Sequence, residues 1–255
     1  MIPPCPLPVR FLATAAIAAF LGSAAHADDL KVKSVLLAEI SPEAPLVLQL
    51  KPGEYSPPVT TRPGHFSDAM KFPRLDTWIF GYNPNGLGEF REICRTTPPP
   101  GDRVWLLFTK SRKNDSPEPA AAEPADSDEP AVDGKDETEE TQPAFDVHAI
   151  GLDPKEIREG GVAVVNTSPT AIEVEMNGKN TKVEPDQHVF VNPEVEPGTS
   201  YPVKFHFLYH DRMRPFVTTN WFRGKKRYSM AIVVPAGAGP TPRLLLAEEI
   251  LDDSE

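Results

Sequence analysis

Six basic side chains alternate with aromatic residues near the carboxyl-terminal end of the sequence. They are Arg212, Arg214, Arg223, Lys225, Lys226 and Arg227, and the aromatic residues among them are Phe216, Trp221, Phe222 and Tyr228. Arg223-Gly224-Lys225-Lys226 has the composition of a turn between two strands. We predict that these cations cluster at one end of a β-sandwich, as an ordinary hairpin tip with solvated charges and Trp221 in the core. The functional alternative, for which the six residues are the candidates, is a surface that binds acidic glycans, lipid headgroups or an acidic protein segment.

Two histidines have a spacing that binds metals on a helix. His206 and His210 stand at i, i+4, which brings two imidazoles together on one helical face. The residues around them alternate, however, with Phe205, Phe207 and Tyr209 on one side, and this pattern is typical of a strand. In a strand the two histidines are about 13 Å apart, too far to share an ion. We therefore expect neither a metal nor a cofactor.

Motifs for other catalytic chemistry are absent from the sequence. It contains no Gly-x-Ser-x-Gly, no Gly-rich phosphate loop ending in Lys-Ser, and no His-Glu-x-x-His. Paired carboxylates of a glycosidase leave no reliable local spacing, so they are not detectable in this way. We expect a non-catalytic binding or structural module, and the alternative is an exported carbohydrate-active hydrolase whose carboxylates the sequence does not identify.

The first 27 residues have the features of a secretory signal peptide. Arg10 precedes an apolar, alanine-rich stretch over residues 11–22, and Ala25-His26-Ala27 fits a small-x-small cleavage site before Asp28. This pattern predicts export to the periplasm or the extracellular space, without a transmembrane span once the signal is removed. Cys94 is then the only cysteine left, and we expect it to be either buried and inert or available for an intermolecular bridge.

An acidic segment over residues 114–144 carries nearly all of the net charge of −11. It holds eleven Asp and Glu residues against the single base Lys135, a net charge of −10. A segment of Pro, Ala, Glu and Asp buries too little apolar surface to fold, so we predict a disordered, extended loop. It is interpreted either as a tolerated surface insertion or as an element that captures a partner, and it could attract the basic hairpin. The acidic balance disfavours nucleic acid as a partner.

Short runs rich in β-branched and aromatic residues predict strands on both sides of this segment. In the first half the expected strands cover 31–38, 45–51, 77–82, 89–94, 103–110 and 145–150. The last two flank the acidic segment and are predicted to pair as a hairpin. Turns are expected at Lys51-Pro52-Gly53-Glu54, at Asn83-Pro84-Asn85-Gly86 and at 98–102. A helical turn capped by Asp153 is expected over 153–158.

The second half has clearer strand signals. Strands are expected over 161–166, 171–176, 179–183, 188–191, 201–210, 216–222, 227–234 and 243–250. Asn177-Gly178 lies between the second and the third, and it predicts a tight type I′ hairpin turn. Pro52-Gly53 in the first half is similar to Pro197-Gly198 in the second, so a diverged internal repeat is possible.

About residues 160–235 contain a series of turn and strand motifs. They are Asn166-Thr167-Ser168-Pro169, the alternating strand after it, Asn177-Gly178 and Glu196-Pro197-Gly198. This segment resembles small secreted bacterial β-sandwich domains of unassigned function. The resemblance implies a fold and a compartment and no site residue. We therefore expect an all-β protein of two antiparallel, immunoglobulin-like β-sandwich modules, over 28–158 and 159–251. The expected partner is an envelope protein or an anionic glycan.

Overall fold

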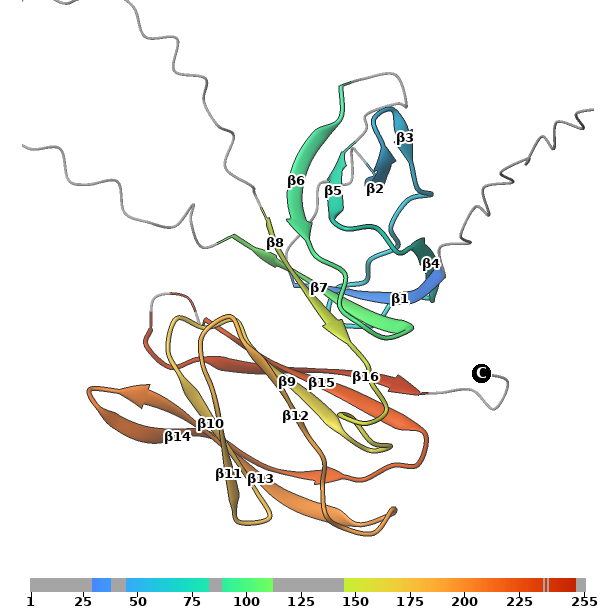
Figure 1. Cartoon of the computed structure of the whole chain (residues 1–255). Helices are drawn as coiled ribbons and strands as arrows, with labels where there is room; N and C mark the ends of the chain where they lie inside the picture. The colour runs from blue at the N-terminus through green and yellow to red at the C-terminus, as the bar shows by residue number, and fades with distance from the viewer. Residues whose placement is uncertain are drawn as a thin grey trace, which may run out of the picture.

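The computed structural model describes residues 29–37, 45–82, 89–111, 145–235, 237 and 239–250. Within these ranges the protein is all-β, with sixteen strands and no helix (Figure 1). The predicted signal peptide, the acidic segment over 114–144 and the predicted turn at Asn83-Pro84-Asn85-Gly86 lie outside the described residues. Among the residues described, no helix is long and apolar enough to cross a membrane.

The first eight strands form two four-stranded sheets. They are β1 (Asp29–Leu36), β2 (Leu46–Lys51), β3 (Glu54–Tyr55), β4 (Met70–Pro73), β5 (Trp78–Tyr82), β6 (Arg91–Thr96), β7 (Arg103–Lys110) and β8 (Phe145–Gly151). One sheet has the order β4-β1-β7-β8 and the other β3-β2-β5-β6. β3 and β4 were not predicted, because β3 has only two residues and β4 has only four and ends at Pro73.

The last eight strands form two more sheets. They are β9 (Val162–Asn166), β10 (Ile172–Met176), β11 (Lys179–Val183), β12 (His188–Val191), β13 (Ser200–Tyr209), β14 (Arg212–Phe222), β15 (Arg227–Val234) and β16 (Arg243–Ile250). Their orders are β12-β9-β15-β16 and β11-β10-β13-β14. All eight coincide with predicted strands, although β14 begins four residues earlier than expected.

The two halves have the same topology. Adding eight to each strand number of the first pair of sheets reproduces the order of the second pair. In this repeat Pro52-Gly53 joins β2 to β3 and corresponds to Asn177-Gly178, which joins β10 to β11. Both glycines have a positive φ, 81° at Gly53 and 73° at Gly178. The similarity of Pro52-Gly53 to Pro197-Gly198 is therefore between positions that are not equivalent.

Two of the four sheets are mixed, whereas the sequence predicted purely antiparallel ones; β3-β2-β5-β6 and β11-β10-β13-β14 are antiparallel throughout. β1 runs parallel to β7, and β9 runs parallel to β15. Parallel strands need a long connection between them, so they do not produce the local hairpin signal on which the prediction rested. They also favour burial on both faces, and these two sheets are the ones buried on both faces.

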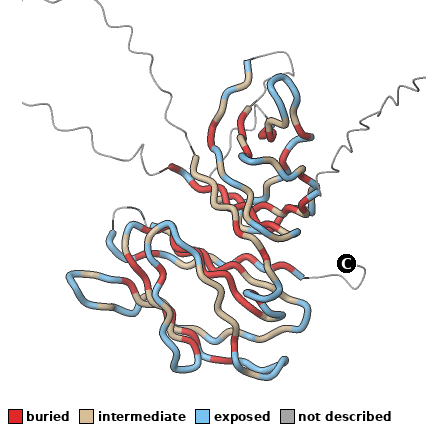
Figure 2. The backbone as a smooth tube through the Cα atoms, viewed as in Figure 1, coloured by how far each residue is buried: buried red, intermediate tan, exposed pale blue. Residues whose placement is uncertain are grey.

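The sheets pack through three apolar cores. The first core joins β4-β1-β7-β8 to β3-β2-β5-β6 around Trp78, Phe80 and Phe108. The third joins β12-β9-β15-β16 to β11-β10-β13-β14 around Val164 and Phe205. Between them, a middle core combines side chains of both halves. Figure 2 shows buried positions in both halves where they face each other. The four sheets therefore form one continuous stack.

Strand β7 shows how one strand supplies two cores. Val104, Leu106 and Phe108 belong to the first core, whereas Trp105 and Leu107 belong to the middle core. Successive side chains of a strand point to opposite faces, so a strand with apolar neighbours on both sides reads as a continuous apolar run. The predicted hairpin of β7 with β8 is confirmed, with Lys110 opposite Phe145.

A buried carboxylate at the rim of the middle core links the two halves. Glu249 of β16 is 3% exposed. Its Oε2 accepts a hydrogen bond of 2.7 Å from the Trp105 indole, and its Oε1 lies 2.8 Å from both Arg103 Nη2 and Lys33 Nζ. All three partners belong to the first half. Charge-assisted hydrogen bonds of this kind are the strong ones, and they satisfy a charge that burial would otherwise penalise.

We predict that Glu249→Ala lowers the free energy of unfolding by about 3 kcal/mol. The change leaves the buried indole N–H without an acceptor and two cations without their counter-ion. The neighbouring Glu248→Ala removes only the half-exposed ion pair with Arg227, and it should cost about 0.5 kcal/mol or less. Urea unfolding followed by fluorescence measures both. Equal effects of the two substitutions would contradict a structural role for Glu249.

Candidate functional site

The six predicted basic residues do not form one cluster. Arg212 and Arg214 lie at the start of β14, whereas Arg223, Lys225, Lys226 and Arg227 follow its end. The eleven residues of β14 separate the two groups by roughly 30 Å. The prediction of one basic end of the sandwich is therefore wrong, because β14 is too long to bring both groups together.

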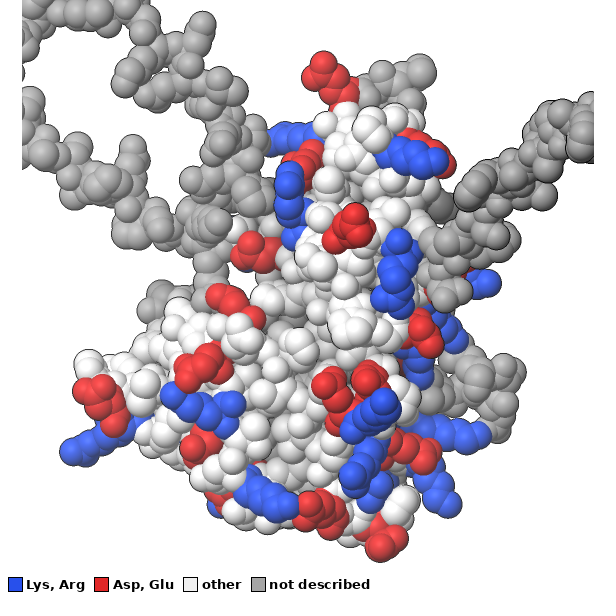
Figure 3. Space-filling view, in the orientation of Figure 1, with Lys and Arg blue, Asp and Glu red and all other residues white. Residues whose placement is uncertain are grey.

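These cations are engaged in different ways. Arg214 stacks over the ring of Tyr209, with 4.8 Å between the guanidinium carbon and the ring centroid. Arg227 lies 3.3 Å from Glu248. The carboxylate of Glu159 accepts a hydrogen bond from the backbone N–H of Lys226. Lysines, arginines and acidic residues are interspersed over the face seen in Figure 3, so this face has no single-sign field.

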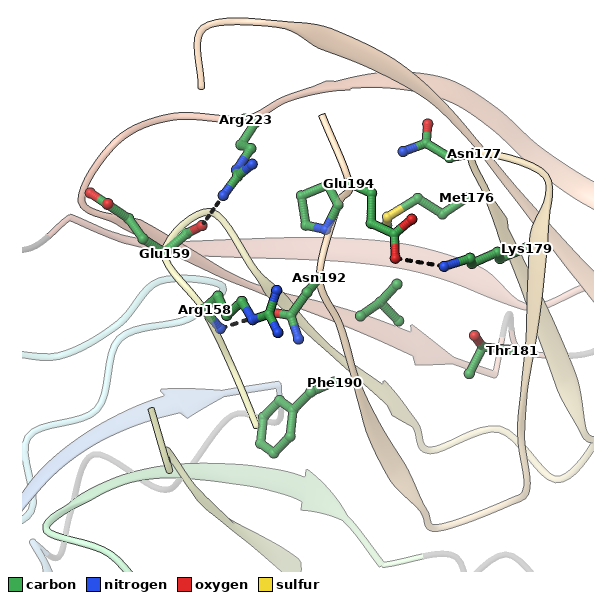
Figure 4. Close-up of a pocket in the computed structure, with 12 residues that line it drawn as sticks. Arg158, Glu159, Met176, Asn177, Lys179, Thr181, Phe190, Asn192, Glu194 and Arg223 are labelled. Atoms are coloured by element: carbon green, nitrogen blue, oxygen red, sulfur yellow. Dashed lines mark hydrogen bonds and ion pairs between the residues drawn. The ribbon is translucent and has the colours of Figure 1, made fainter. Parts of the chain in front are cut away.

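A pocket of about 410 Å³ lies in the second half beside the linker that joins the halves (Figure 4). Of the six predicted cations, it includes Arg223 alone. Its walls come from the linker, the β10–β11 hairpin, β12 and the loop after β12. The lining residues are Arg158, Glu159, Met176, Asn177, Lys179, Thr181, Phe190, Val191, Asn192, Pro193, Glu194 and Arg223.

The linker turn positions Arg158 and Glu159 at the pocket. Asp153 begins this turn, as predicted, since its side chain accepts from Lys155 N at 2.8 Å and its carbonyl accepts from Ile157 N at 2.9 Å. Ile157 is buried in the middle core. The Asn192 carboxamide then accepts from Arg158 N at 2.7 Å, which ties the linker to the loop after β12. The middle core therefore holds one wall of the pocket in place.

The β10–β11 hairpin supplies the opposite wall. Asn177 and Gly178 both have positive φ, 51° and 73°, as the predicted type I′ turn requires. The turn projects Lys179 toward Glu194, and Nζ lies 2.6 Å from Oε1 (Figure 4). This contact lowers the pKa of Glu194, because the hydrogen bond and the positive charge of Lys179 favour the carboxylate.

Arg223 closes one end of the pocket through backbone contacts. Its Nη1 donates to the Val195 carbonyl, and its Nη2 lies 3.4 Å from the Glu159 carbonyl. Its Nε is buried and has no hydrogen-bond partner among the described residues. Arg223 therefore acts mainly as a brace between the linker and the loop after β12.

The pocket combines an exposed cation, whose charge also helps to lower the pKa of Glu194, with polar and aromatic groups. Arg158 is exposed, and its guanidinium makes no hydrogen bond or short ion pair with the part of the chain that the structure describes. Asn177 and Thr181 add an amide and a hydroxyl, and Phe190 adds a ring face (Figure 4). A planar guanidinium suits a carboxylate or a phosphate through two parallel hydrogen bonds.

The predicted separation of the two histidines agrees with the structure. His206 is within β13, whereas His210 occupies the turn to β14 with a φ of 47°. In the described ranges, no group of three or more His, Cys, Asp and Glu residues is arranged to hold a metal ion.

Sequence reasoning missed most of the pocket. Arg158, Asn177 with Thr181, and Phe190 come from three separate segments, the linker, the β10–β11 hairpin and β12, and no local motif connects these segments. The side-chain contact of Asn192 with the linker, 34 residues away, brings these segments together, and a single sequence carries no signal for it.

Comparison with known proteins places the chain in no family. No protein-family model matches the sequence, and no curated protein matches it. The pocket and the exposed strands therefore carry the functional inference.

Cys94 is predicted to be inert in the folded protein. It is 3% exposed within the first core, and burial, with smaller effects of Glu92 and Asp146, raises its pKa to about 12. A chain that begins at Asp28 should therefore react with a thiol reagent at pH 8 at least roughly a hundredfold more slowly when folded than in denaturant. Because the pKa is raised on folding, the contribution of Cys94 to stability is complete below about pH 8.5 and declines above it. Rapid labelling of the folded chain would contradict this burial.

Proposed function

We propose that this protein is an exported, non-catalytic binding module of the cell envelope that holds an anionic glycan in the pocket beside Arg158. The observation that carries the proposal is the exposed guanidinium of Arg158, which makes no hydrogen bond or short ion pair with the described residues, in a pocket of about 410 Å³. Ligand pockets have volumes of this order and a few convergent polar groups. The export signal over 1–27 supports a ligand outside the cytoplasm.

An acidic sugar matches the chemistry of the lining better than a simple anion does. Its carboxylate would pair with the Arg158 guanidinium, and its hydroxyls would exchange hydrogen bonds with Asn177 and Thr181. The ring of Phe190 offers an apolar face to the C–H groups of a pyranose. The neutral ion pair of Lys179 with Glu194 adds a donor and an acceptor without changing the net charge.

The carboxylates of the pocket favour binding over cleavage. A glycosidase needs a carboxylic acid whose pKa is raised so that it can protonate the leaving group. Lys179 lowers the pKa of Glu194 instead. The Glu159 carboxylate is already engaged by the backbone of Lys226. These two contacts support the non-catalytic function over the hydrolase.

We further infer that each half is one β-sandwich of immunoglobulin-like architecture. Two four-stranded sheets enclose a core in each half, and β2 pairs with β5 as strands B and E do in immunoglobulin domains. The parallel pairs β1–β7 and β9–β15 give these sandwiches a strand order of their own.

We predict that Arg158→Gln weakens binding of a galacturonate oligosaccharide roughly tenfold or more, because it removes a charge-assisted pair with the carboxylate. Isothermal titration calorimetry measures the affinity of the wild type and the variant. Arg243→Gln is the matched control, since Arg243 is exposed and remote from the pocket lining.

Three results would count against the proposal. Equal affinity of the two variants would exclude Arg158 as the carboxylate partner. Equal binding of the corresponding neutral galactose oligosaccharide would exclude an anionic ligand. Release of new reducing ends during the titration would favour the hydrolase.

A further inference from the structure

The longest strand of the protein is also an edge strand. β14 has eleven residues and lies at the end of the sheet β11-β10-β13-β14, hydrogen-bonded to β13 alone. The other edge strands of the described sheets have two to eight residues. An exposed edge offers a row of unpaired N–H and C=O groups, and natural proteins usually keep such edges short or protect them.

Protection of this edge is confined to one end. Arg212, Arg214 and Pro215 are three of the first four residues of β14, and charge and proline both discourage pairing with another strand. From Phe216 to Phe222 the sequence Phe-Val-Thr-Thr-Asn-Trp-Phe has no charge and no proline. Its β-branched and aromatic residues have high strand propensity. This half of β14 is therefore open to another strand.

A groove accompanies the open half of the edge. A cavity of about 170 Å³ lies between β14 and β16. Its lining combines apolar side chains, among them Trp221, Phe222 and Leu246, with the ion pair of Arg227 and Glu248. Phe222 is 54% exposed and Leu246 is 43% exposed, although most large apolar side chains of the described chain are buried. Exposed large apolar side chains beside such a cavity are typical of an interaction site.

Positive charge at both ends of β14 indicates which kind of strand would pair with its open half. Arg212 and Arg214 precede the open half, and Lys225 and Lys226 follow it. Two copies of β14 paired antiparallel about Thr219 would bring Arg212 of one copy near the turn that carries Lys225 and Lys226 of the other, and like charges close together are unfavourable. An extended segment with carboxylates at both ends would place opposite charges there instead.

We propose that β14 binds an extended acidic segment of a partner protein by β-strand addition. The partner segment pairs its main chain with Phe216–Phe222, places one apolar side chain in the groove beside Trp221 and Leu246, and sets its terminal carboxylates against the two basic ends. In this mode main-chain hydrogen bonds supply affinity, and side-chain pockets supply specificity. The groove shares no lining residue with the pocket at Arg158, although Arg223 of that pocket directly follows Phe222.

The test uses a synthetic peptide in which valines and threonines alternate between paired aspartates at each end. Amide hydrogen exchange of the full chain, followed by NMR, reports pairing directly. We expect amides within Phe216–Phe222 to exchange at least roughly tenfold more slowly with the peptide bound. The same peptide with alternate backbone nitrogens methylated should lose this effect, because it cannot complete the ladder.

Charge reversal tests the role of the basic ends. Arg212→Glu combined with Lys225→Glu should weaken the peptide roughly tenfold or more, and a peptide with lysines in place of the aspartates should restore binding. Lys155→Glu with Lys182→Glu is the control of equal charge change, since both lysines are exposed away from β14.

Three outcomes would overturn the proposal. The first is equal binding of the methylated peptide, which would exclude main-chain pairing. The second is a peptide-independent dimer that protects Phe216–Phe222, which would make a second copy the occupant. The third is protection without peptide that disappears when residues 112–144 are deleted, which would make the acidic segment of the chain itself the occupant.

Discussion

The middle core is the constraint on which the rest of the structure depends. The sheets β4-β1-β7-β8 and β12-β9-β15-β16 are each apolar on both faces, so neither half can leave its outer face in water without a large cost. Side chains such as Trp105, Leu107, Ile232 and Ala247 are almost completely buried there. Glu249, which reaches from the second half to three donors of the first, fixes the register of this contact. The halves therefore behave as one stack of four sheets.

The packing of the four sheets also fixes the position of the linker that forms one wall of the candidate pocket. The linker between the halves is anchored in the middle core through Leu152 and Ile157, and the next residue, Arg158, points its guanidinium at the pocket. A flexible linker would lose conformational entropy on binding a ligand, and this loss would weaken the affinity. A linker that the core already orders avoids most of this loss. The edge at β14 lies on one of the two outer sheets of the stack, where it is hydrogen-bonded to β13 alone among the described strands.

Much of the fold was predictable from single strands, and the arrangement of the sheets was not. Alternation in Ile172–Met176, the continuous apolar run in Arg103–Lys110 and the Asn177-Gly178 turn each predicted the local structure correctly. The continuous apolar run in Arg103–Lys110 indicates a strand of a central sheet that is buried on both faces. The sequence contains no local pattern that predicts which sheet covers the second face. The site was harder, because Arg158 and Phe190 meet only through tertiary contacts. The six basic residues were predicted to form one cluster because they are close in sequence. In the structure the length of β14 separates them into two groups.

Native-state hydrogen exchange in low urea tests the unity of the stack most directly. Cooperative units open with their own free energy and their own dependence on denaturant. If the middle core joins the halves, the slowest amides of β7 in the first half and of β9 in the second should converge on one opening free energy and one urea dependence. Two separate values, with smaller urea dependence for each half, would show that the halves unfold independently and would contradict the role of the middle core.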